Sequence, residues 1–322
     1  MGNFLRGNQV SSIHTIAFYN LENLFDTIND PYILDDDFLP DSDREWNVKK
    51  YDSKLYKLGD AIAKIGHRSA KKVPTLLGVA EVENKKVLAD LIAAKPLKKH
   101  SYHYVHYNSP DERGIDVALL YQKQFFKVVS SQSVPLYIEN EPGVRDYTRD
   151  ILWVEGVLNE ERIHILVNHW PSRREGSDST RHKRIAAATK NREVITKIRE
   201  AEPNAKIIVM GDFNDDPFSE SVKNQLVQDD FYNPMEKTHS RYRGSLSYRR
   251  QWNQFDQVIL SNNFHRYVKG KHSFAKADIF DPEFLRVYQG KYKGVPFRTY
   301  VGDDWQGGYS DHFPVYIQLK LN

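Results

Sequence analysis

Residues 206–217, KIIVMGDFNDDP, constrain the fold of this chain more than any other stretch. The four consecutive apolar residues 207–210 are typical of a strand that is buried on both faces. The run stops at Gly211, and Asp212 and Asn214 follow it two positions apart, a spacing that can direct both side chains into one pocket. Because Asn, Asp, Gly and Pro also favour turns, the stretch alone leaves a catalytic strand end and a simple turn equally open.

Other apolar stretches repeat this arrangement. Each alone has an ordinary explanation, because a glutamate at a strand end is usually a helix cap or a surface charge and a lone histidine is usually structural. Their recurrence predicts a rim where carboxylates, amides and two imidazoles meet. The polar residues beside the expected strands are Asn20, Glu22, Glu81, Asn168, His169, Asp212, Asn214, Asp311 and His312.

The remaining pattern mixes helices with hairpins. Helical spacing of apolar residues predicts helices at 51–65, 83–94 and 179–199. Expected strands are 15–20, 75–80, 102–107, 115–121, 151–158, 162–167, 206–210, 255–260 and 314–319. With no repeat, linker or low-complexity tract, the sequence predicts one α/β (α+β) domain with mixed sheets at 15–322, preceded by a tail at 1–14.

Metal chemistry in this chain must rely on oxygen and imidazole ligands. The 322 residues include no cysteine, which excludes disulfides, thiolate metal sites and a cysteine nucleophile. Clustered carboxylates are costly unless a cation neutralises them, and no lysine or arginine is evident beside Glu22, Glu81 and Asp311. A hard divalent ion, Mg²⁺ or else Mn²⁺ or Ca²⁺, is therefore expected. Imidazoles beside such an ion suit acid/base work or charge stabilisation at phosphorus.

Positive charge is concentrated in one segment. Residues 237–300 carry thirteen Lys/Arg against four Asp/Glu and contain thirteen aromatic residues, whereas the whole chain carries a net charge of only +3. Arg241, Arg243, Arg249 and Arg250 lie among tyrosines and a tryptophan just before the expected strand at 255–260. Basic groups with interleaved aromatic rings suit a polyanion, first of all DNA; a compact polyphosphate would use the same arginines. A phospholipid headgroup would call for exposed apolar loops, which are not evident.

The sequence constrains the compartment only weakly. No apolar run approaches the length of a membrane span, and the first twelve residues contain no signal-peptide core. A soluble chain is expected, either exported after removal of a leader or cytoplasmic, and we expect a monomer.

Seven ordered motifs resemble those of the endonuclease/exonuclease/phosphatase superfamily, the group of DNase I, apurinic endonucleases, neutral sphingomyelinases and inositol-polyphosphate 5-phosphatases. They extend over residues 18–315, nearly the whole chain. They are FYNLEN at 18–23, GVAEVEN at 78–84, RGIDVALLY at 113–121, VNHWPSR at 167–173, GDFNDDP at 211–217, QFDQVIL at 254–260 and SDHFPV at 310–315. The resemblance implies a DNase I-like four-layer sandwich, with two mixed β-sheets face to face and helices outside.

The resemblance also implies roles for individual residues. Glu81 would be the main metal ligand, with Asn20 and Glu22 nearby and Asp311 contributing directly or through water. Asp212 would orient or deprotonate the attacking water, and Asn214 would hold the phosphate or the water. His312, positioned by Asp256, and His169 would act at the scissile phosphate. Arg149, Arg249 and Arg250 would contact substrate phosphates, and Asp116 is an even choice between support of His169 and a plain strand-start carboxylate.

These expectations define a divalent-metal-dependent phosphoesterase in which water attacks phosphorus in line. A phosphodiesterase acting on DNA, as endonuclease or exonuclease, is the first reading. The alternatives are a phosphatase or phospholipid phosphodiesterase of the same superfamily, or a binding protein that keeps the fold without the chemistry. Ala80 stands where many nucleases of the group have Gln, and the insertions at 26–50 and 266–305 are expected to carry specificity.

Overall fold

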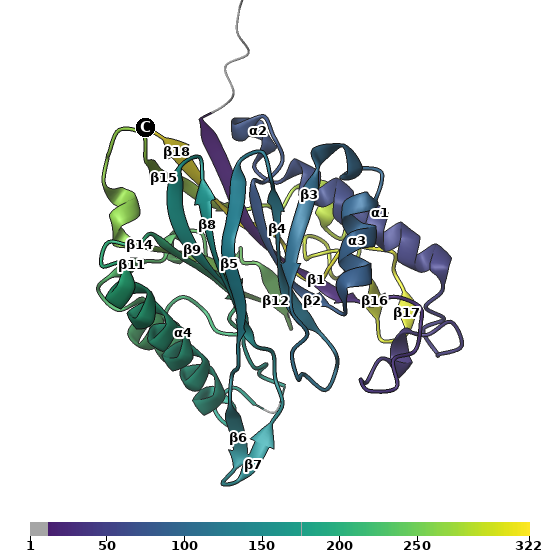
Figure 1. Ribbon diagram of the computed structural model, residues 1–322. Coiled ribbons are helices and arrows are strands. Elements are labelled where there is room, and N and C mark those ends of the chain that lie inside the picture. Colours follow the sequence, from purple (N-terminus) through teal and green to yellow (C-terminus); the bar gives the residue numbers. More distant parts are fainter. Residues whose placement is uncertain (1–11, 175) are drawn as a thin grey trace, which may run out of the picture.

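Two six-stranded β-sheets face each other in the centre of the molecule, and helices cover their outer faces (Figure 1). The computed structural model describes residues 12–174 and 176–322. Helices α1 (Val48–Lys64) and α3 (Lys85–Ala93) lie outside one sheet, and α4 (Arg181–Ala201) lies outside the other. The expected four-layer α/β sandwich is therefore confirmed.

The first sheet has the strand order β15-β18-β1-β2-β4-β3. Its β1 and β2 are parallel and its other pairs are antiparallel, which makes it a mixed sheet. The strands are β1 (Ile13–Leu24), β2 (Leu76–Val82), β3 (Tyr102–His106), β4 (Asp116–Gln122), β15 (His272–Ile279) and β18 (Val315–Leu321).

The second sheet has the order β11-β14-β10-β9-β8-β5, with β9 and β10 parallel and its other pairs antiparallel. Its strands are β5 (Phe126–Val134), β8 (Ile151–Leu158), β9 (Glu161–His169), β10 (Ile207–Asp212), β11 (Phe231–Tyr232) and β14 (Asp256–Ser261). Three hairpins stand apart: β6 (Ile138–Glu141) with β7 (Val144–Asp146), β12 (Leu246–Tyr248) with β13 (Gln251–Asn253), and β16 (Tyr300–Val301) with β17 (Asp304–Trp305).

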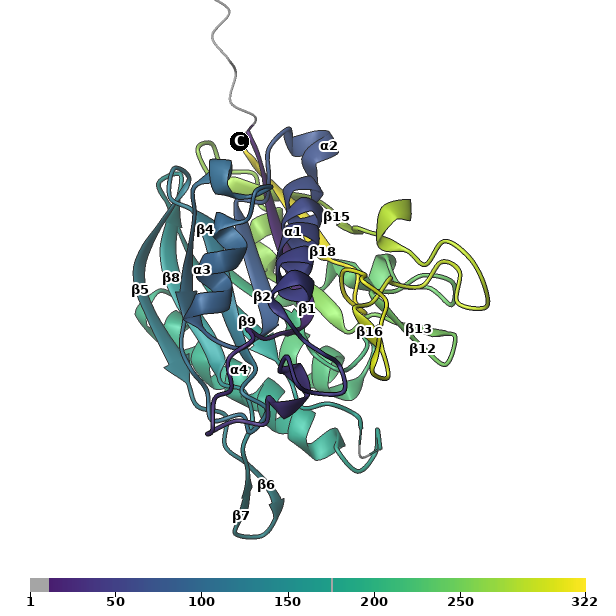
Figure 2. The same cartoon turned by 90° about the vertical axis from the view of Figure 1, so that its right-hand side faces the viewer.

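Short helical segments complete the chain. They are α2 (His67–Ala70), η1 (Asp36–Phe38), η2 (Lys98–His100), η3 (Ser221–Val227), η4 (Pro234–Lys237), η5 (Asn262–His265) and η6 (Glu283–Leu285). Figure 2 shows α1 and α3 lying across the first sheet, with the yellow segment that carries β16 beside them. No helix among the described residues is long and apolar enough to cross a membrane.

Strand β10 shows why the chain folds into layers. Its residues alternate between two cores: Ile208 and Met210 join the cluster between the sheets, and Ile207 and Val209 join the cluster under α4. All four are fully buried. The continuous apolar run of this strand therefore reflects burial on both faces, as the sequence predicts.

Every helix and strand that the sequence predicts is present, although the ends are shifted by a few residues. Some strands of the structure were not predicted. Strand β1 begins at Ile13, so the last two residues assigned to the tail belong to the sheet, while residues 1–11 lie outside the described part. The edge strands β5 and β15 were not predicted, because they alternate irregularly between exposed and buried residues and are largely polar.

Candidate active site

Three acid/base side chains form one row across the second sheet. Asp212, the last residue of β10, is the register partner of His169 on β9 and of Asp256 on β14. Side chains that are directly opposite in a sheet point to the same face. Backbone pairing alone therefore gathers an imidazole and two carboxylates at one rim.

The glycine before Asp212 is required by this close pairing. A Cβ at Gly211 would lie 2.3 Å from the backbone oxygen of Asn168, which no real side chain allows. Asn168 is itself buried, and its Oδ1 accepts from Trp170 and from Asn191 of α4. Asn168 thus anchors the strand end to the helix and does not face the reaction centre.

The first sheet supplies its carboxylates through an irregular ladder. Asn20 on β1 pairs with Ala80 on β2, but the next pair is Leu24 with Val82, so the register shifts between them. Glu22 and Glu81 lie within this shift and both have positive φ, 52° and 61°. Bulges of this kind redirect side chains. A positive φ is uncommon for residues with a Cβ, so the backbone at this rim is locally strained.

The two sheets meet at Asn20 and Asp212. Asn20 Nδ2 donates to Asp212 Oδ2 over 3.1 Å and lies 3.3 Å from Glu81 Oε1. His169 Nε2 is 3.8 Å from Asp212 Oδ2 and 3.9 Å from Glu81 Oε1, and His312 Nε2 is 3.9 Å from the same Asp212 oxygen. Asp212 Oδ2 is therefore the point on which the amide and both imidazoles converge.

His312 and Asp256 form a buried pair. His312 Nδ1 lies 2.7 Å from Asp256 Oδ2, and Ser310 Oγ accepts from the backbone N–H of His312. Burial alone would lower the pKa of His312, but the charge of Asp256 and its hydrogen bond raise it well above 6.5. His312 is thus held protonated, with Nε2 turned toward Asp212.

His169 has the opposite protonation state. Burial, assisted by the charge of Arg149, lowers the pKa of His169 well below 6.5, so this imidazole is neutral. Burial and the neighbouring Asp256 raise the pKa of Asp212 to about 7. Titratable groups whose pKa values are pushed apart in one pocket are the usual basis for assigning an acid and a base.

Acidic groups at the rim could hold a divalent cation. Ligand atoms of Asp212, Asp256 and His312 all lie within 4.8 Å of one another. Glu81 lies beside Asn20, and although burial raises its pKa, nearby charges, chiefly that of Arg113, more than offset that effect, so the carboxylate is ionised. Its Oε2 accepts from the backbone N–H of Asn23 over 2.8 Å.

Glu22 and Asp311 are joined by an arginine that the sequence did not indicate. Arg298 Nε donates to Glu22 Oε1 over 3.1 Å, and its Nη2 donates to Asp311 Oδ2 over 3.0 Å. The expectation that no basic side chain neutralises these acids is therefore wrong. Arg298 lies 276 residues after Glu22 and inside an insertion, so no local signal could have paired them.

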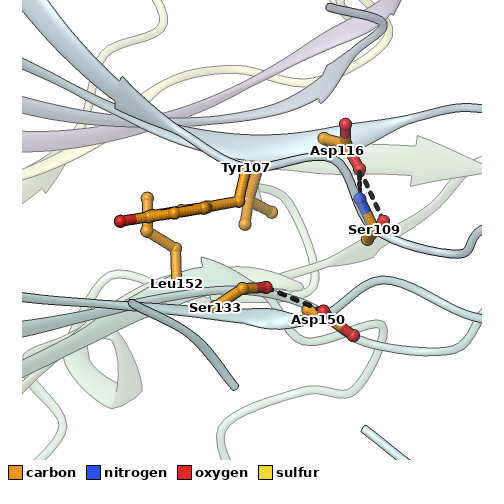
Figure 3. Close-up of a pocket in the computed structure, with 7 residues that line it drawn as sticks. Tyr107, Ser109, Asp116, Ser133, Asp150 and Leu152 are labelled. Carbon is orange, nitrogen blue, oxygen red and sulfur yellow. Dashed lines mark hydrogen bonds between the residues drawn. The ribbon is translucent and has the colours of Figure 1, made fainter. Parts of the chain in front are cut away.

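Asp116 does not support His169. It lies between the sheets, where Oδ2 bonds His106 Nε2 at 3.0 Å and Oδ1 accepts from the backbone and hydroxyl of Ser109. Figure 3 shows this aspartate beside a cavity of about 10 Å³ that Asp150 and Ser133 also line. The histidine that it holds is His106, so Asp116 is a structural carboxylate.

Arg149 and Asn214 border the row. Arg149 is buried, and it donates to Asp111 Oδ2 and to the backbone oxygen of Trp170, the residue after His169. Asn214 Nδ2 donates to that same oxygen over 3.0 Å, and its backbone N–H caps Asp212 Oδ1. Both predicted residues therefore lie at the rim.

Arg249 and Arg250 occupy the tip of the β12–β13 hairpin. Both have positive φ, 49° and 65°, as the two central residues of a type I′ turn do, and both are exposed. The hairpin is tied to the site, because Leu246 bridges His312 and the N–H of Phe313 donates to Ser245. Arg243 forms ion pairs with Asp278 and Asp281.

A sequence model described as the endonuclease/exonuclease/phosphatase family matches residues 15–321. No curated protein matches the chain by sequence. Similar folds occur in a humanized TDP2 from D. rerio (15% identity, TM-score 0.60, 96% of this chain and 100% of that one covered) and in a mannosyl-6-phosphatase from Bacteroides thetaiotaomicron (17%, 0.58, 95% and 99%). D. rerio TDP2 complexed with a single-strand DNA product is also similar (16%, 0.56, 96% and 100%).

Proposed function

Because the chain belongs to the endonuclease/exonuclease/phosphatase family, we propose that it hydrolyses phosphodiester bonds, with DNA as the leading substrate and a divalent metal as cofactor. The observation that carries the proposal is the convergence on Asp212 Oδ2. This oxygen lies within 4 Å of one protonated and one neutral imidazole, opposite an ionised Glu81.

The residues divide the reaction between them. Asp212, with a pKa of about 7, accepts a proton from the attacking water and is oriented by Asn20 and by the N–H of Asn214. Protonated His312 donates a hydrogen bond to a phosphoryl oxygen, where charge develops. Neutral His169, on the other side of Asp212, hydrogen-bonds the phosphate from the opposite flank.

A divalent ion would be held by Glu81, with Asp311 beside it. Carboxylate oxygens of this kind suit Mg²⁺ or Mn²⁺. When bound, such an ion supplies Lewis-acid stabilisation of the charge that grows on phosphorus-bound oxygens.

The exposed hairpin favours a nucleic acid. Arg249 and Arg250 extend from a strand that bridges His312, and Tyr248 beside them is 62% exposed. Cations neutralise phosphates on either side of the cleaved bond, and an exposed ring can stack on a base. A phosphomonoester would need only the buried part of the site, so phosphatase activity is the second candidate.

The test is an activity panel with Mg²⁺ or Mn²⁺ on plasmid DNA, an abasic duplex, RNA, sphingomyelin, an inositol polyphosphate and mannose 6-phosphate. We expect DNA cleavage that chelation abolishes and that Glu81→Gln removes or makes dependent on higher metal concentrations. Monoester hydrolysis without DNA cleavage would instead establish a phosphatase. Full activity in excess chelator would exclude the metal.

A further inference from the structure

Each oxygen of the Glu22 carboxylate accepts a hydrogen bond from the segment at residues 298–299. Oε1 accepts from Arg298 Nε, and Oε2 accepts from the backbone N–H of Thr299 over 2.7 Å. Glu22 is only 4% exposed. A cation bound by this carboxylate would lie beside the guanidinium of Arg298, and that positive charge disfavours a metal ligand at this position.

The surroundings of Glu22 are built to hold the segment that carries Arg298. Lys54, fully buried, donates both to the backbone oxygen of Glu22 and to the hydroxyl of Thr299. Residues 298 and 299 are thereby clamped to the bulge in β1 through three separate contacts. The positive φ of Glu22 directs its side chain at this clamp.

Arg298 itself remains open on one side. Its side chain is 45% exposed although Glu22 and Asp311 both accept from it. Within residues 12–174 and 176–322, no hydrogen bond uses its Nη1. Asp311 Oδ1 lies 3.8 Å from His312 Nε2, so a single side chain, that of Asp311, connects the guanidinium of Arg298 with His312.

We propose that Arg298 is a phosphate-binding residue of this site and that Glu22 is its holder, not a ligand of the metal. This assignment rests on the proposed phosphoesterase function. A planar guanidinium fixed by two carboxylates presents its remaining N–H groups in a set direction, and such donors recognise phosphoryl oxygens well. The metal then depends on Glu81, on the other flank of Asn20.

The first experiment separates the roles of the two glutamates without turnover. Mn²⁺ is titrated into wild type, Glu81→Gln and Glu22→Gln by calorimetry. Glu81→Gln should weaken Mn²⁺ binding by about tenfold or more, as the loss of an important metal contact does. Glu22→Gln should weaken it far less. Equal losses in the two variants would overturn the assignment of Glu22.

The second experiment tests phosphate binding in chelator, where DNA is not cleaved. The probes are a 5′-phosphorylated oligothymidylate and inorganic phosphate. Arg298→Gln should weaken binding of at least one probe by about tenfold, the value of one charge-assisted contact, and Arg298→Lys should recover part of it. A loss for both probes indicates recognition of any phosphate, and a loss for the oligonucleotide alone indicates a nucleic-acid contact.

Arg162→Gln is the matched control. Arg162 also pairs with one carboxylate, that of Glu155, and its side chain is 54% exposed, but it lies at the far end of the strand that ends at His169. If Arg298→Gln weakens neither probe more than Arg162→Gln does, Arg298 does not bind phosphate. Neither experiment needs catalysis, so the binding results can be interpreted even if no substrate of the activity panel is cleaved. Arg298→Gln decides the point even if Glu22→Gln does not fold.

Discussion

At the scale of single residues, Asp212 owes its properties to its neighbours. The strand places it, but burial and Asp256 raise its pKa to about 7, and Asn20 orients the oxygen that faces both imidazoles. His169 and His312 flank the same atom in opposite protonation states. The sequence motifs predicted which residues meet here. They could not predict the protonation states, because those depend on burial and distance.

Replacement of Asp212, His169 or His312 by alanine should lower kcat by ~10²–10⁴-fold each, the usual worth of a general acid or base. Since all three act on one phosphorus, a double variant should lose far less than the product of the single losses. Steady-state kinetics on the best substrate of the panel measures this. His67→Ala, an exposed histidine of α2, is the control and should keep wild-type kcat.

If the double variant instead loses the full product of the two single losses, the residues act independently and the shared site is wrong. Thermal unfolding of the His169→Ala and Asp212→Ala variants should remain close to wild type, because these side chains end strands and are not part of the apolar clusters. His312→Ala should unfold at a lower temperature, because it leaves the buried carboxylate of Asp256 without its partner.

At the scale of elements, the β12–β13 hairpin connects surface charge to the reaction centre. It pairs with His312 at one end and carries two arginines at the other. Both arginines adopt a left-handed backbone that Asn and Gly adopt more readily. Two charged residues therefore occupy a turn where the local backbone preference favours Asn and Gly.

Replacement of Arg249 by Asn together with Arg250 by Gly removes both charges and supplies the preferred turn pair. The hairpin should still form, and KM for DNA should rise more than kcat falls. In a plot of the logarithm of the DNA-binding constant against the logarithm of the salt concentration, the slope should become less steep by about one for each lost phosphate contact. Kinetics at several salt concentrations test this. The control is the double variant Lys291→Ala with Lys293→Ala, which removes two exposed charges elsewhere in the basic segment.

Equal effects of the two double variants would show that only overall charge matters. Unchanged KM in the hairpin variant would remove the arginines from substrate binding.

The expected elements and the observed ones differ where local pattern carries little information. Strand β10 was predicted because its apolar run is unbroken. Strand β5 was missed because its buried and exposed residues do not alternate regularly. The bulges at Glu22 and Glu81 were not predictable, since a register shift depends on the partner strand. For the same reason, the sequence named Glu22 as an acid of the site but not Arg298 as its partner.

At the scale of the whole molecule, the sandwich separates the site from a second buried cluster of polar groups. His14 near the start of β1 lies about 20 Å along the strand from Asn20, at 3.3 Å per residue. Its Nδ1 lies 2.9 Å from Thr75 Oγ1, and Asn159 bonds its Nε2. Burial, with Lys72 and His272 nearby, lowers the pKa of His14 to about 3.

Stability should therefore fall in mild acid through His14. The folded pKa of about 3 is below the unfolded value of 6.5, so this contribution is present above pH 6.5 and is lost as the pH falls toward 3. Between pH 7.5 and 5.5, the free energy of unfolding should drop by about 1.4 kcal/mol through this group. His14→Gln should lack that part of the drop. Urea unfolding of both proteins at the two pH values measures it, and equal drops would contradict the assignment.

The row of His169, Asp212 and Asp256 has a consequence for motion. These residues are held by ladder bonds between three central strands, so they can separate only if the sheet itself opens. Arg298 instead precedes a hairpin of two-residue strands. The hairpin is anchored independently of the sheets' ladder bonds, because Thr299 donates to Glu22 and Tyr300 Oη donates to the backbone oxygen of Arg44. Sequence change in the insertion that keeps these two contacts can therefore alter the surface beside Arg298 while the reacting groups keep their alignment.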